Sequence, residues 1–335
     1  MTTNTVEYTY KDFASDQEVR WCPGCDDYVI LRSIQKALPE VGRKKEDIVF
    51  ISGIGCSSRF PYYMNTYGMH SIHGRAPAVA TGLKLANPNL SVWVITGDGD
   101  ALAIGGNHFI HVLRRNVDLN IVLFNNEIYG LTKGQFSPTT EIGHKTKSSP
   151  YGNIQPPFLP GELALGAQAR FFARIPGNNP RQQKEAFVHA ETFRGTSLIE
   201  VLQNCVIFND GAFDEFTDKD NRKHKLMHVE HGKPMLFDGG TKGLILKGLK
   251  LEVVSVGEGG VDESDVLVHD AHENDVTLHQ MLVRLRYPLV TGIIREVKDV
   301  TLDTMMMNQI AEVKANSKFH TTTDLFKSGE TYTVD

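Results

Sequence analysis

Two short polar motifs follow apolar runs and carry the side chains with the most specific chemistry. GDGD occupies residues 97–100 and NN occupies residues 125–126. Carboxylate and amide oxygens are ligands that Mg²⁺ prefers, and glycines let backbone N–H groups approach a phosphate closely. Each motif alone would be typical of a turn or a strand-end cap. Together, at two successive strand ends, they predict a site for Mg²⁺ and a diphosphate, with Asp98 and Asn126 as metal ligands.

The four cysteines, Cys22, Cys25, Cys56 and Cys205, form the second group with distinctive chemistry. The first two make a tight CPGC pair and the other two each follow an expected strand, so all four can meet at one edge of a sheet. Four thiolates can hold an iron–sulfur cluster or a tetrahedral zinc ion, but zinc ribbons usually supply two CxxC pairs. A buried structural thiol suits Cys205 alone, and a thioredoxin-like pair would not precede the first strand. The spacing therefore favours a cluster.

An alternation of strands and helices positions these motifs. Apolar runs at 48–52, 92–96, 120–124 and 197–201 alternate with helical patterns at 74–86, 101–115 and 180–193. This pattern predicts an α/β fold, with a doubly wound parallel sheet covered on both faces. Ligands bind at the carboxyl ends of strands in such sheets, which is where the motifs lie. The stretch 135–160, rich in Ser, Thr, Pro and Gly, is expected to be a long ordered loop that serves the site.

The same pattern divides the chain into three regions. Residues 1–47 form an N-terminal segment with the CPGC pair, residues 48–209 form the α/β domain, and residues 210–335 form a C-terminal extension. One helix is expected in the extension, at 276–285.

Charge and hydropathy exclude several classes of partner. The 35 basic and 40 acidic side chains are spread along the 335 residues, so no basic tract suits nucleic acid or a membrane surface. No apolar window is long enough to span a bilayer, and the N-terminus lacks the features of a signal peptide. Such a chain has little need of disulfides. We expect a cytoplasmic protein without nucleic-acid or membrane partners.

The order GDG, then a strand, then NN resembles the thiamine-diphosphate motif of the pyrophosphate-binding domain in that enzyme superfamily. The resemblance implies a third magnesium ligand, the backbone carbonyl of Ile128. A helix that begins near Ala101 would direct its positive end at the diphosphate. A nicotinamide site fits less well, because Gly53-Ile54-Gly55 has Ser58 where the third glycine of that motif would stand.

Longer segments resemble the β subunit of the 2-oxoacid:ferredoxin oxidoreductases. Between Trp21 and Phe213 they are WCPGC, GIGCSSR, HGRAPAVATGLK, GDGDALAIGGNH, NNEIYGLTKGQFSPT, SSPYGNIQPPF and QNCVIFNDGAF. The later HGKPM and VTLHQMLVRLRYPLVTGIIREV also resemble that family. One departure is Asp26, where many relatives have glycine after CPGC. Its side chain is expected to alter the potential or solvent access of the cluster without removing a ligand.

The resemblance implies a reaction and its cofactors. In that family a 2-oxoacid loses carbon dioxide on thiamine diphosphate and Mg²⁺, electrons pass through a 4Fe-4S cluster to ferredoxin, and coenzyme A takes the acyl group. Carboxylation is the same chemistry reversed. The residues expected around the cofactor are Gly55, Cys56, Ser57, His73, Gly97, Asp98, Gly99, Asp100, Asn126, Ile128, Tyr129, Gly130 and Leu131.

One part of that machinery has no counterpart in the sequence. The pyrimidine-binding domain, whose glutamate activates the thiamine ring in this superfamily, would need a further run of strands and helices that we do not find. We therefore expect an obligate α subunit that carries this domain, in an αβ dimer or an (αβ)2 assembly, with the active site between chains.

Substrate choice depends on charge. The second carboxylate of 2-oxoglutarate must meet cationic or hydrogen-bonding groups, and Arg59 and Lys133 both follow strands that end at the site. The alternative for Arg59 and for Lys133 is that the side chain contacts the diphosphate, the partner chain or solvent instead of the substrate. His73 is a third candidate, for contact with a phosphate or the reacting carboxylate, or for a hydrogen bond at a helix start.

The family likeness then selects a substrate. HGRAPAVATGLK and HGKPM most resemble members that use 2-oxoglutarate, with pyruvate and branched-chain 2-oxoacids as alternatives. Two other readings remain. One is a simple 2-oxoacid decarboxylase, which the four cysteines disfavour, and the other is a non-enzymatic, zinc-stabilised binding module.

Overall fold

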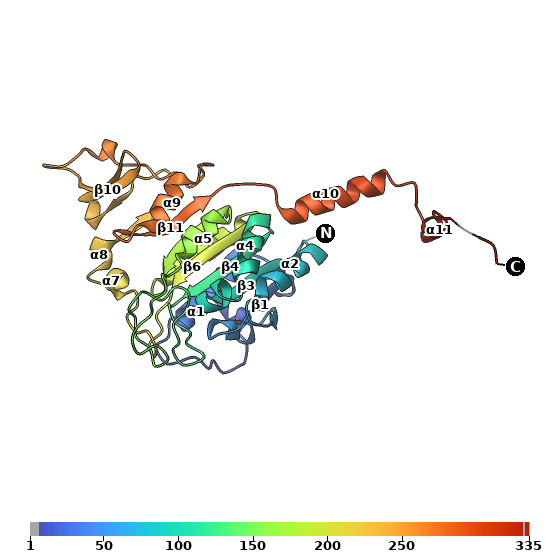
Figure 1. Cartoon of the computed structure of the whole chain (residues 1–335), viewed down its shortest axis with the longest axis horizontal. Helices are drawn as coiled ribbons and strands as arrows, with labels where there is room; N and C mark the ends of the chain where they lie inside the picture. The colour runs from blue at the N-terminus through green and yellow to red at the C-terminus, as the bar shows by residue number, and fades with distance from the viewer. Residues whose placement is uncertain (1–6, 331, 335) are drawn as a thin grey trace.

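One eight-stranded sheet organises the computed structural model, which describes residues 7–330 and 332–334 (Figure 1). The strand order is β2-β1-β3-β4-β6-β5-β11-β7, and every neighbouring pair is parallel except β5 with β11. The strands are β1 (Ile48–Ser52), β2 (Tyr67–His70), β3 (Ser91–Gly97), β4 (Leu119–Asn125), β5 (Phe171–Pro176), β6 (Thr196–Leu202), β7 (Leu226–Val229) and β11 (Leu289–Glu296).

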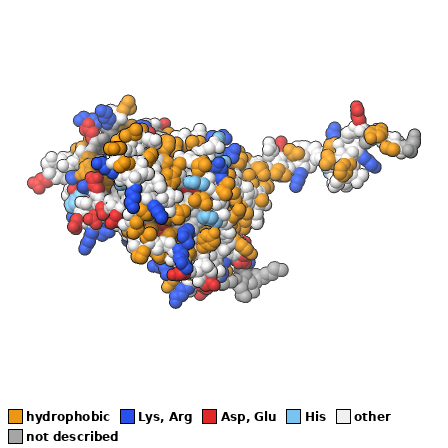
Figure 2. All heavy atoms as spheres, turned by 60° about the horizontal axis from the view of Figure 1, so that its bottom comes forward, with side chains coloured by type: hydrophobic (Ala, Val, Ile, Leu, Met, Phe, Trp, Pro, Cys, Tyr) orange, Lys and Arg blue, Asp and Glu red, His pale blue; other side chains and the backbone are white. Residues whose placement is uncertain are grey.

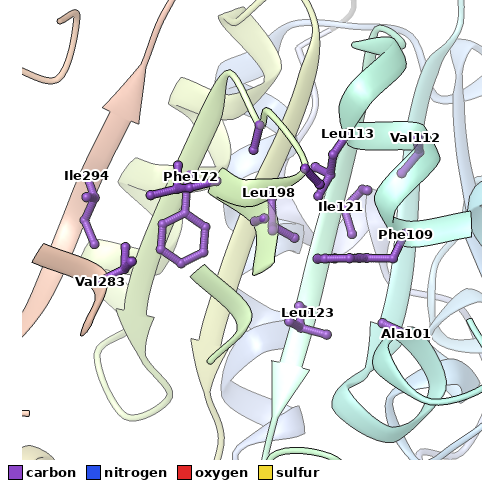
Figure 3. Close-up of a cluster of buried hydrophobic side chains, with 14 of the residues drawn as sticks. Ala101, Phe109, Val112, Leu113, Ile121, Leu123, Phe172, Leu198, Val283 and Ile294 are labelled. Carbon is purple, nitrogen blue, oxygen red and sulfur yellow. The ribbon is translucent and has the colours of Figure 1, made fainter. Parts of the chain in front are cut away.

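Helices cover both faces of this sheet. On one face α1 (Asp27–Val41) packs against α6 (Pro180–Thr192), and on the other lie α2 (Ala76–Ala86), α4 (Gly106–Arg115), α5 (Pro160–Gly166) and α9 (Thr277–Arg284). Side chains of β4 alternate between the two cores: Ile121 and Leu123 contact the α4 side (Figure 3), whereas Val122 and Phe124 join the α1 and α6 side. This two-sided burial explains why the strand is apolar at every one of these positions.

The predicted fold class is confirmed, and so are most of the predicted elements. The runs at 48–52, 92–96, 120–124 and 197–201 are β1, β3, β4 and β6, and the helices expected at 74–86, 180–193 and 276–285 are α2, α6 and α9. Other elements were not anticipated, among them α1, the strand β5 and the antiparallel entry of β11. A glycine in the left-handed region ends α1, since Gly42 has φ 72°.

The prediction of one helix at 101–115 is wrong in one respect, because two helices occupy this stretch. A short α3 (Asp98–Leu102) starts directly at the GDGD motif, before the expected start at Ala101, and α4 begins after a break. At the break the backbone of Gly105 runs close to other backbone: a Cβ on Gly105 would lie 2.4 Å from the carbonyl oxygen of Asp100 and 3.0 Å from Cα of Gly74. Only glycine fits there.

The C-terminal residues extend the sheet and add to it. Beyond residue 209 lie β7 and β11, the short helices α7 (Asp214–Thr217) and α8 (Arg222–Lys225), and a three-stranded antiparallel sheet of β8 (Leu236–Phe237), β9 (Lys242–Lys247) and β10 (Lys250–Ser255). The division at residue 209 stays a prediction, and the main sheet crosses it. The helices α10 (Leu302–Ala315) and α11 (Thr322–Phe326) project from the body as an arm (Figures 1 and 2).

Lys and Arg side chains lie among Asp and Glu side chains on the face that Figure 2 shows, without a continuous basic stripe. Across the described residues, no helix combines the length and the apolar character that crossing a membrane requires.

Candidate cofactor and cluster site

One small cavity, of about 100 Å³, lies at the carboxyl ends of β1, β3 and β4. All of the residues expected around the cofactor line it: Gly55, Cys56, Ser57, His73, Gly97, Asp98, Gly99, Asp100, Asn126, Ile128, Tyr129, Gly130 and Leu131. The strands β3 and β4 are neighbours, so GDGD and NN end side by side. The structure thus gathers these residues in one place, while their individual roles remain predictions.

Asp98 is a buried carboxylate, with 2% of its surface exposed. Its Oδ2 accepts hydrogen bonds from the hydroxyls of Ser137 at 2.5 Å and Thr139 at 2.6 Å. Burial raises the pKa of Asp98, and these two hydroxyls lower it in part. In the described ranges, Asp98 has no Lys, Arg or His partner in an ion pair. A buried carboxylate that lacks a cation suits a metal ligand.

Asn126 and Ile128 line the same cavity as Asp98, from the loop after β4. The Oδ1 of Asn126 accepts a hydrogen bond from the backbone N–H of Ile128 at 3.2 Å. The phenol of Tyr129 donates to the carbonyl of Gly99 at 3.0 Å, which joins this loop to the GDGD turn. A Cβ on Gly99 would lie 2.3 Å from the Tyr129 ring, so glycine is required there. One carboxylate, one amide and one carbonyl are therefore available in this cavity, a donor set that fits Mg²⁺.

Asp100, the second acid of GDGD, has a different environment. Its carboxylate accepts hydrogen bonds from the side chains of His73 at 2.5 Å and Thr96 at 2.7 Å. The backbone N–H groups of Ile54 and Gly74 also donate to it, at 3.1 and 2.7 Å. Because protein groups engage both oxygens, we expect Asp100 to hold the surrounding loops and His73 in place around the cofactor.

The three residues expected to contact substrate are separated by the fold. His73 lines the small cavity. Arg59 lines an adjoining hollow of about 500 Å³, which shares Gly55 and Leu131 with the cavity. Lys133 is exposed and has a positive φ of 76°, and it lines neither space. Within the described part of the chain, neither Arg59 nor Lys133 forms an ion pair.

The four cysteines converge beside the cavity. A Cβ on Gly130 would lie 3.5 Å from Sγ of Cys56 and 3.5 Å from Sγ of Cys205, so these two sulfurs are at most 7.0 Å apart, twice that distance. Cys22 and Cys25 share one turn, in which Cys25 N–H bonds to the Cys22 carbonyl at 3.1 Å. Burial, and then the nearby carboxylate Asp27, raise the pKa of Cys56 to about 12, and they raise that of Cys25 as well.

Hydrogen bonds hold the CPGC segment against the sheet. The indole of Trp21 donates to the carbonyl of Cys56 at 2.7 Å, and the amide of Gln203 donates to Sγ of Cys25 at 3.2 Å. Asp26, the residue that departs from the family pattern, accepts a hydrogen bond from Asn204 N–H at 2.9 Å. Its side chain therefore ties the start of α1 to the segment after β6.

The described residues contain no preformed site for a single metal ion. Within residues 7–330 and 332–334, no group of three or more His, Cys, Asp or Glu side chains could hold a metal ion. A zinc ion requires its thiolates within about 2.3 Å of one point, whereas the ligands of an iron–sulfur cluster surround a larger body. Which of the two groups the four thiols hold therefore stays a prediction.

Sequence reasoning missed three residues at this site. Ser137 and Thr139 contact Asp98 from the long loop after β4, which was expected only as a loop that serves a site. Asp27 lines the cavity with 2% exposure, and its Oδ2 has no hydrogen-bond partner. Burial, with Asp26 nearby, raises the pKa of Asp27 to about 7. The serine and threonine content of the loop was a signal for the first two, and nothing local marked Asp27.

Comparison with known protein families agrees with this geometry. Residues 53–201 match the family of thiamine pyrophosphate enzymes in its C-terminal TPP binding domain. These residues contain GDGD, NN, the strands β2, β3, β4 and β5, and all of β6 except its last residue. The match therefore covers β3 and β4, two of the strands that end at the small cavity, and the loop that follows β1.

Individual relatives give a finer comparison. The 2-oxoglutarate oxidoreductase subunit KorB of Mycobacterium tuberculosis is 50% identical over 332 residues, which covers 97% of this chain and 88% of that protein. The 2-oxoacid:ferredoxin oxidoreductase 1 subunit beta of Aeropyrum pernix is 47% identical over 65% of this chain and 68% of its own length. A solved structure of 2-oxoglutarate:ferredoxin oxidoreductase from Magnetococcus marinus, with 2-oxoglutarate, coenzyme A and succinyl-CoA bound, superposes with a TM-score of 0.79. It is 29% identical and covers 98% of both chains.

Proposed function

The chain belongs to the β subunits of the 2-oxoacid:ferredoxin oxidoreductases, and we propose that it acts with a partner subunit on 2-oxoglutarate and coenzyme A. The products are succinyl-CoA and carbon dioxide, with ferredoxin as electron acceptor, and the reverse carboxylation uses the same site. The observation that carries this proposal is the 50% identity, over nearly the whole chain, to a protein named 2-oxoglutarate oxidoreductase subunit KorB.

For Mg²⁺ and thiamine diphosphate, the proposed ligands are Asp98, the Asn126 side chain and the Ile128 carbonyl. Bound thiamine diphosphate supplies the electron sink for decarboxylation. The chain contributes a buried carboxylate braced by Ser137 and Thr139, which keeps the metal ligand in one orientation before the cofactor arrives. His73, fixed by its 2.5 Å contact through Nδ1 with Asp100, lies at the cavity wall, where its imidazolium form would donate the second N–H to a phosphate or to the reacting carboxylate.

For the 4Fe-4S cluster, the proposed ligands are Cys22, Cys25, Cys56 and Cys205. Cys56 lines the cofactor cavity, so a cluster held by these four thiolates would lie next to the cofactor and could accept its electrons. The zinc-stabilised module is the alternative. Iron and sulfide analysis of an anaerobic preparation distinguishes them, because a colourless protein with stoichiometric zinc would contradict the cluster.

For the 2-oxoglutarate distal carboxylate, Arg59 is the better placed of the two candidate cations. Its hollow adjoins the cofactor cavity, and its guanidinium has no acidic partner in the described residues. Lys133 is exposed next to Thr132, which does line the cavity, so its reach depends on the orientation of one flexible side chain. Pyruvate and branched-chain 2-oxoacids lack this carboxylate and would leave Arg59 without a partner.

An α subunit with a pyrimidine-binding domain completes the proposed enzyme, in an αβ dimer or an (αβ)2 assembly. The test is to copurify the complex anaerobically and to assay ferredoxin reduction with 2-oxoglutarate, pyruvate and branched-chain 2-oxoacids. We expect the highest kcat/KM with 2-oxoglutarate. Turnover by this chain purified alone would contradict the need for a partner, and a preference for pyruvate would contradict the substrate.

A further inference from the structure

A second and larger cavity, of about 640 Å³, lies against the same segment that forms the cofactor cavity. Residues Phe124, Asn126 and Ile128 line the small cavity, whereas Asn125 and Glu127 line the large one. The two cavities therefore lie on either side of one stretch of backbone, the end of β4 and the turn that follows it, in which Glu127 has a positive φ of 57°. The proposed function gives the large cavity no role.

Asn125 leaves one hydrogen-bond acceptor without a partner at the wall of this cavity. Its side chain is 3% exposed, and its Nδ2 donates to Oε1 of Glu200 at 2.8 Å. A carboxylate can only accept, so this contact fixes which end of the amide is nitrogen. The opposite atom, Oδ1, is buried and has no hydrogen-bond partner. Leaving such an atom unpaired is costly, which indicates a missing donor.

Glu127 adds a second acceptor that is not engaged. Its backbone carbonyl accepts from Thr140, but within the described ranges its carboxylate makes no hydrogen bond and no ion pair. The other three carboxylates at this cavity are all paired. These pairs are Glu200 with Arg174 at 2.8 Å, Glu215 with Lys225 at 3.1 Å, and Glu141 with Arg286 at 3.2 Å.

The principal buried donor at this cavity is already engaged. Arg174 directs Nε to Glu200, Nη1 to the Val290 carbonyl at 3.4 Å and Nη2 to the Val283 carbonyl at 3.5 Å. In the described residues none of its N–H groups bonds to Asn125 Oδ1 or to the Glu127 carboxylate. Asn125 Oδ1 and the Glu127 carboxyl are therefore the unmatched groups. A donor with positive charge complements both, because a cation beside a carboxyl favours its ionised, hydrogen-bond-accepting form.

The size and the walls of the cavity define the rest of the ligand. The volume lies within the usual range of sites for small organic molecules. In residues 7–330 and 332–334, no group of three or more acidic, His or Cys side chains could hold a bare metal ion. Apolar side chains complete the lining, among them Phe158, Phe213 and Leu285. These walls suit an apolar stem or ring behind a charged head.

We propose that the large cavity binds a small organic cation, a guanidinium or ammonium group on an apolar stem, with its head at Glu127 and Asn125 Oδ1. Two structural features connect the large cavity to the cofactor site. Asn125 and Glu127 alternate with the proposed metal ligands, and Thr139 lines the large cavity while donating to Asp98 at 2.6 Å.

The probes are benzylguanidinium and its neutral analogue benzylurea, each titrated into the full chain and followed by ligand-observed NMR. Benzylguanidinium is expected to bind, and Glu127→Gln to weaken it roughly ten- to a hundred-fold, the usual effect of removing one charge-assisted contact. The matched control is Glu215→Gln, which lines the same cavity but is already paired with Lys225 and should change the affinity less than threefold.

Two results would overturn the proposal: equal binding of benzylurea and benzylguanidinium by the unmodified chain, or unchanged binding of benzylguanidinium by Glu127→Gln. The first comparison needs no variant, so it decides even if Glu127→Gln does not fold. Both measurements use the chain without substrate or thiamine diphosphate. They therefore fail or succeed independently of the 2-oxoglutarate assays.

Discussion

Asp98→Asn separates metal binding from folding more cleanly than any other change at the site. The asparagine keeps the shape of the side chain and one acceptor for Ser137 and Thr139, but it removes the only charged ligand proposed for Mg²⁺. A charge-assisted contact is worth about 1.5–3 kcal/mol, so Mg²⁺-dependent affinity for thiamine diphosphate should fall roughly ten- to a hundred-fold.

The same change should leave the empty chain at least as stable. Burial raises the pKa of Asp98, which means that the folded protein opposes its negative charge when no cation is bound. Replacing the carboxylate with a neutral amide removes the free-energy cost of burying this charge. The thermal midpoint without ligand is therefore expected to stay constant or rise, while the increase caused by Mg²⁺ and thiamine diphosphate is lost.

Asp100→Asn is the matched control for this experiment. Asp100 is equally buried, at 2% exposure, but four protein groups donate to its carboxylate, and an amide would present N–H to at least one of them. The neutral amide loses the charge-assisted part of these hydrogen bonds, and a hydrogen bond to a charged group is worth about 1.5–3 kcal/mol, so this variant should unfold at lower temperature. Calorimetric titration and thermal unfolding of the assembled complex measure both effects. Undiminished affinity in Asp98→Asn would refute its assignment as the metal ligand.

Three further predictions concern other parts of the site. Each of Cys22→Ser, Cys25→Ser, Cys56→Ser and Cys205→Ser should lower iron content under anaerobic conditions, and a full cluster in three of the four would show that the ligand set is wrong. Arg59→Ala, and to a smaller extent Lys133→Ala, should raise KM for 2-oxoglutarate roughly ten- to a hundred-fold more than for 2-oxobutyrate; equal losses on both substrates would assign them to the cofactor or the fold. Burial, and then Glu141, raise the pKa of Glu127 from 4.5 to about 8, so the ligand-free chain should lose stability as pH rises through this interval. Denaturant unfolding from pH 5 to 9 measures this loss. The free energy of unfolding should decline less steeply with pH in Glu127→Gln than in the unmodified chain, and identical slopes would show that Glu127 does not cause the decline.

The sequence alone determined the elements whose signals are local. The strands β1, β3, β4 and β6 are mostly apolar and fully or almost fully buried because helices cover both faces of the sheet, and such runs can be recognised without knowing their neighbours. GDGD and NN could be placed together for a similar reason, since both directly follow strands and parallel strands end at one edge. The family likeness rested on these same segments.

Only the tertiary structure decided what individual polar side chains do. Asp98 and Asp100 are two residues apart in one motif, yet one contacts the loop that contains Ser137 and Thr139 and the other anchors His73. Their sequence context is nearly the same, and the difference comes from which distant segments pack against each oxygen.

The remaining features depend on long-range packing in the same way. The antiparallel strand β11 joins the sheet from more than a hundred residues beyond β5, and no local pattern fixes such a pairing. The separation of Asn125 and Asn126 into two cavities arises because the loop after β4 and the C-terminal residues enclose space on the second side of the segment. Residue types set the available chemistry, whereas the packing of distant segments decided which of those groups share a site.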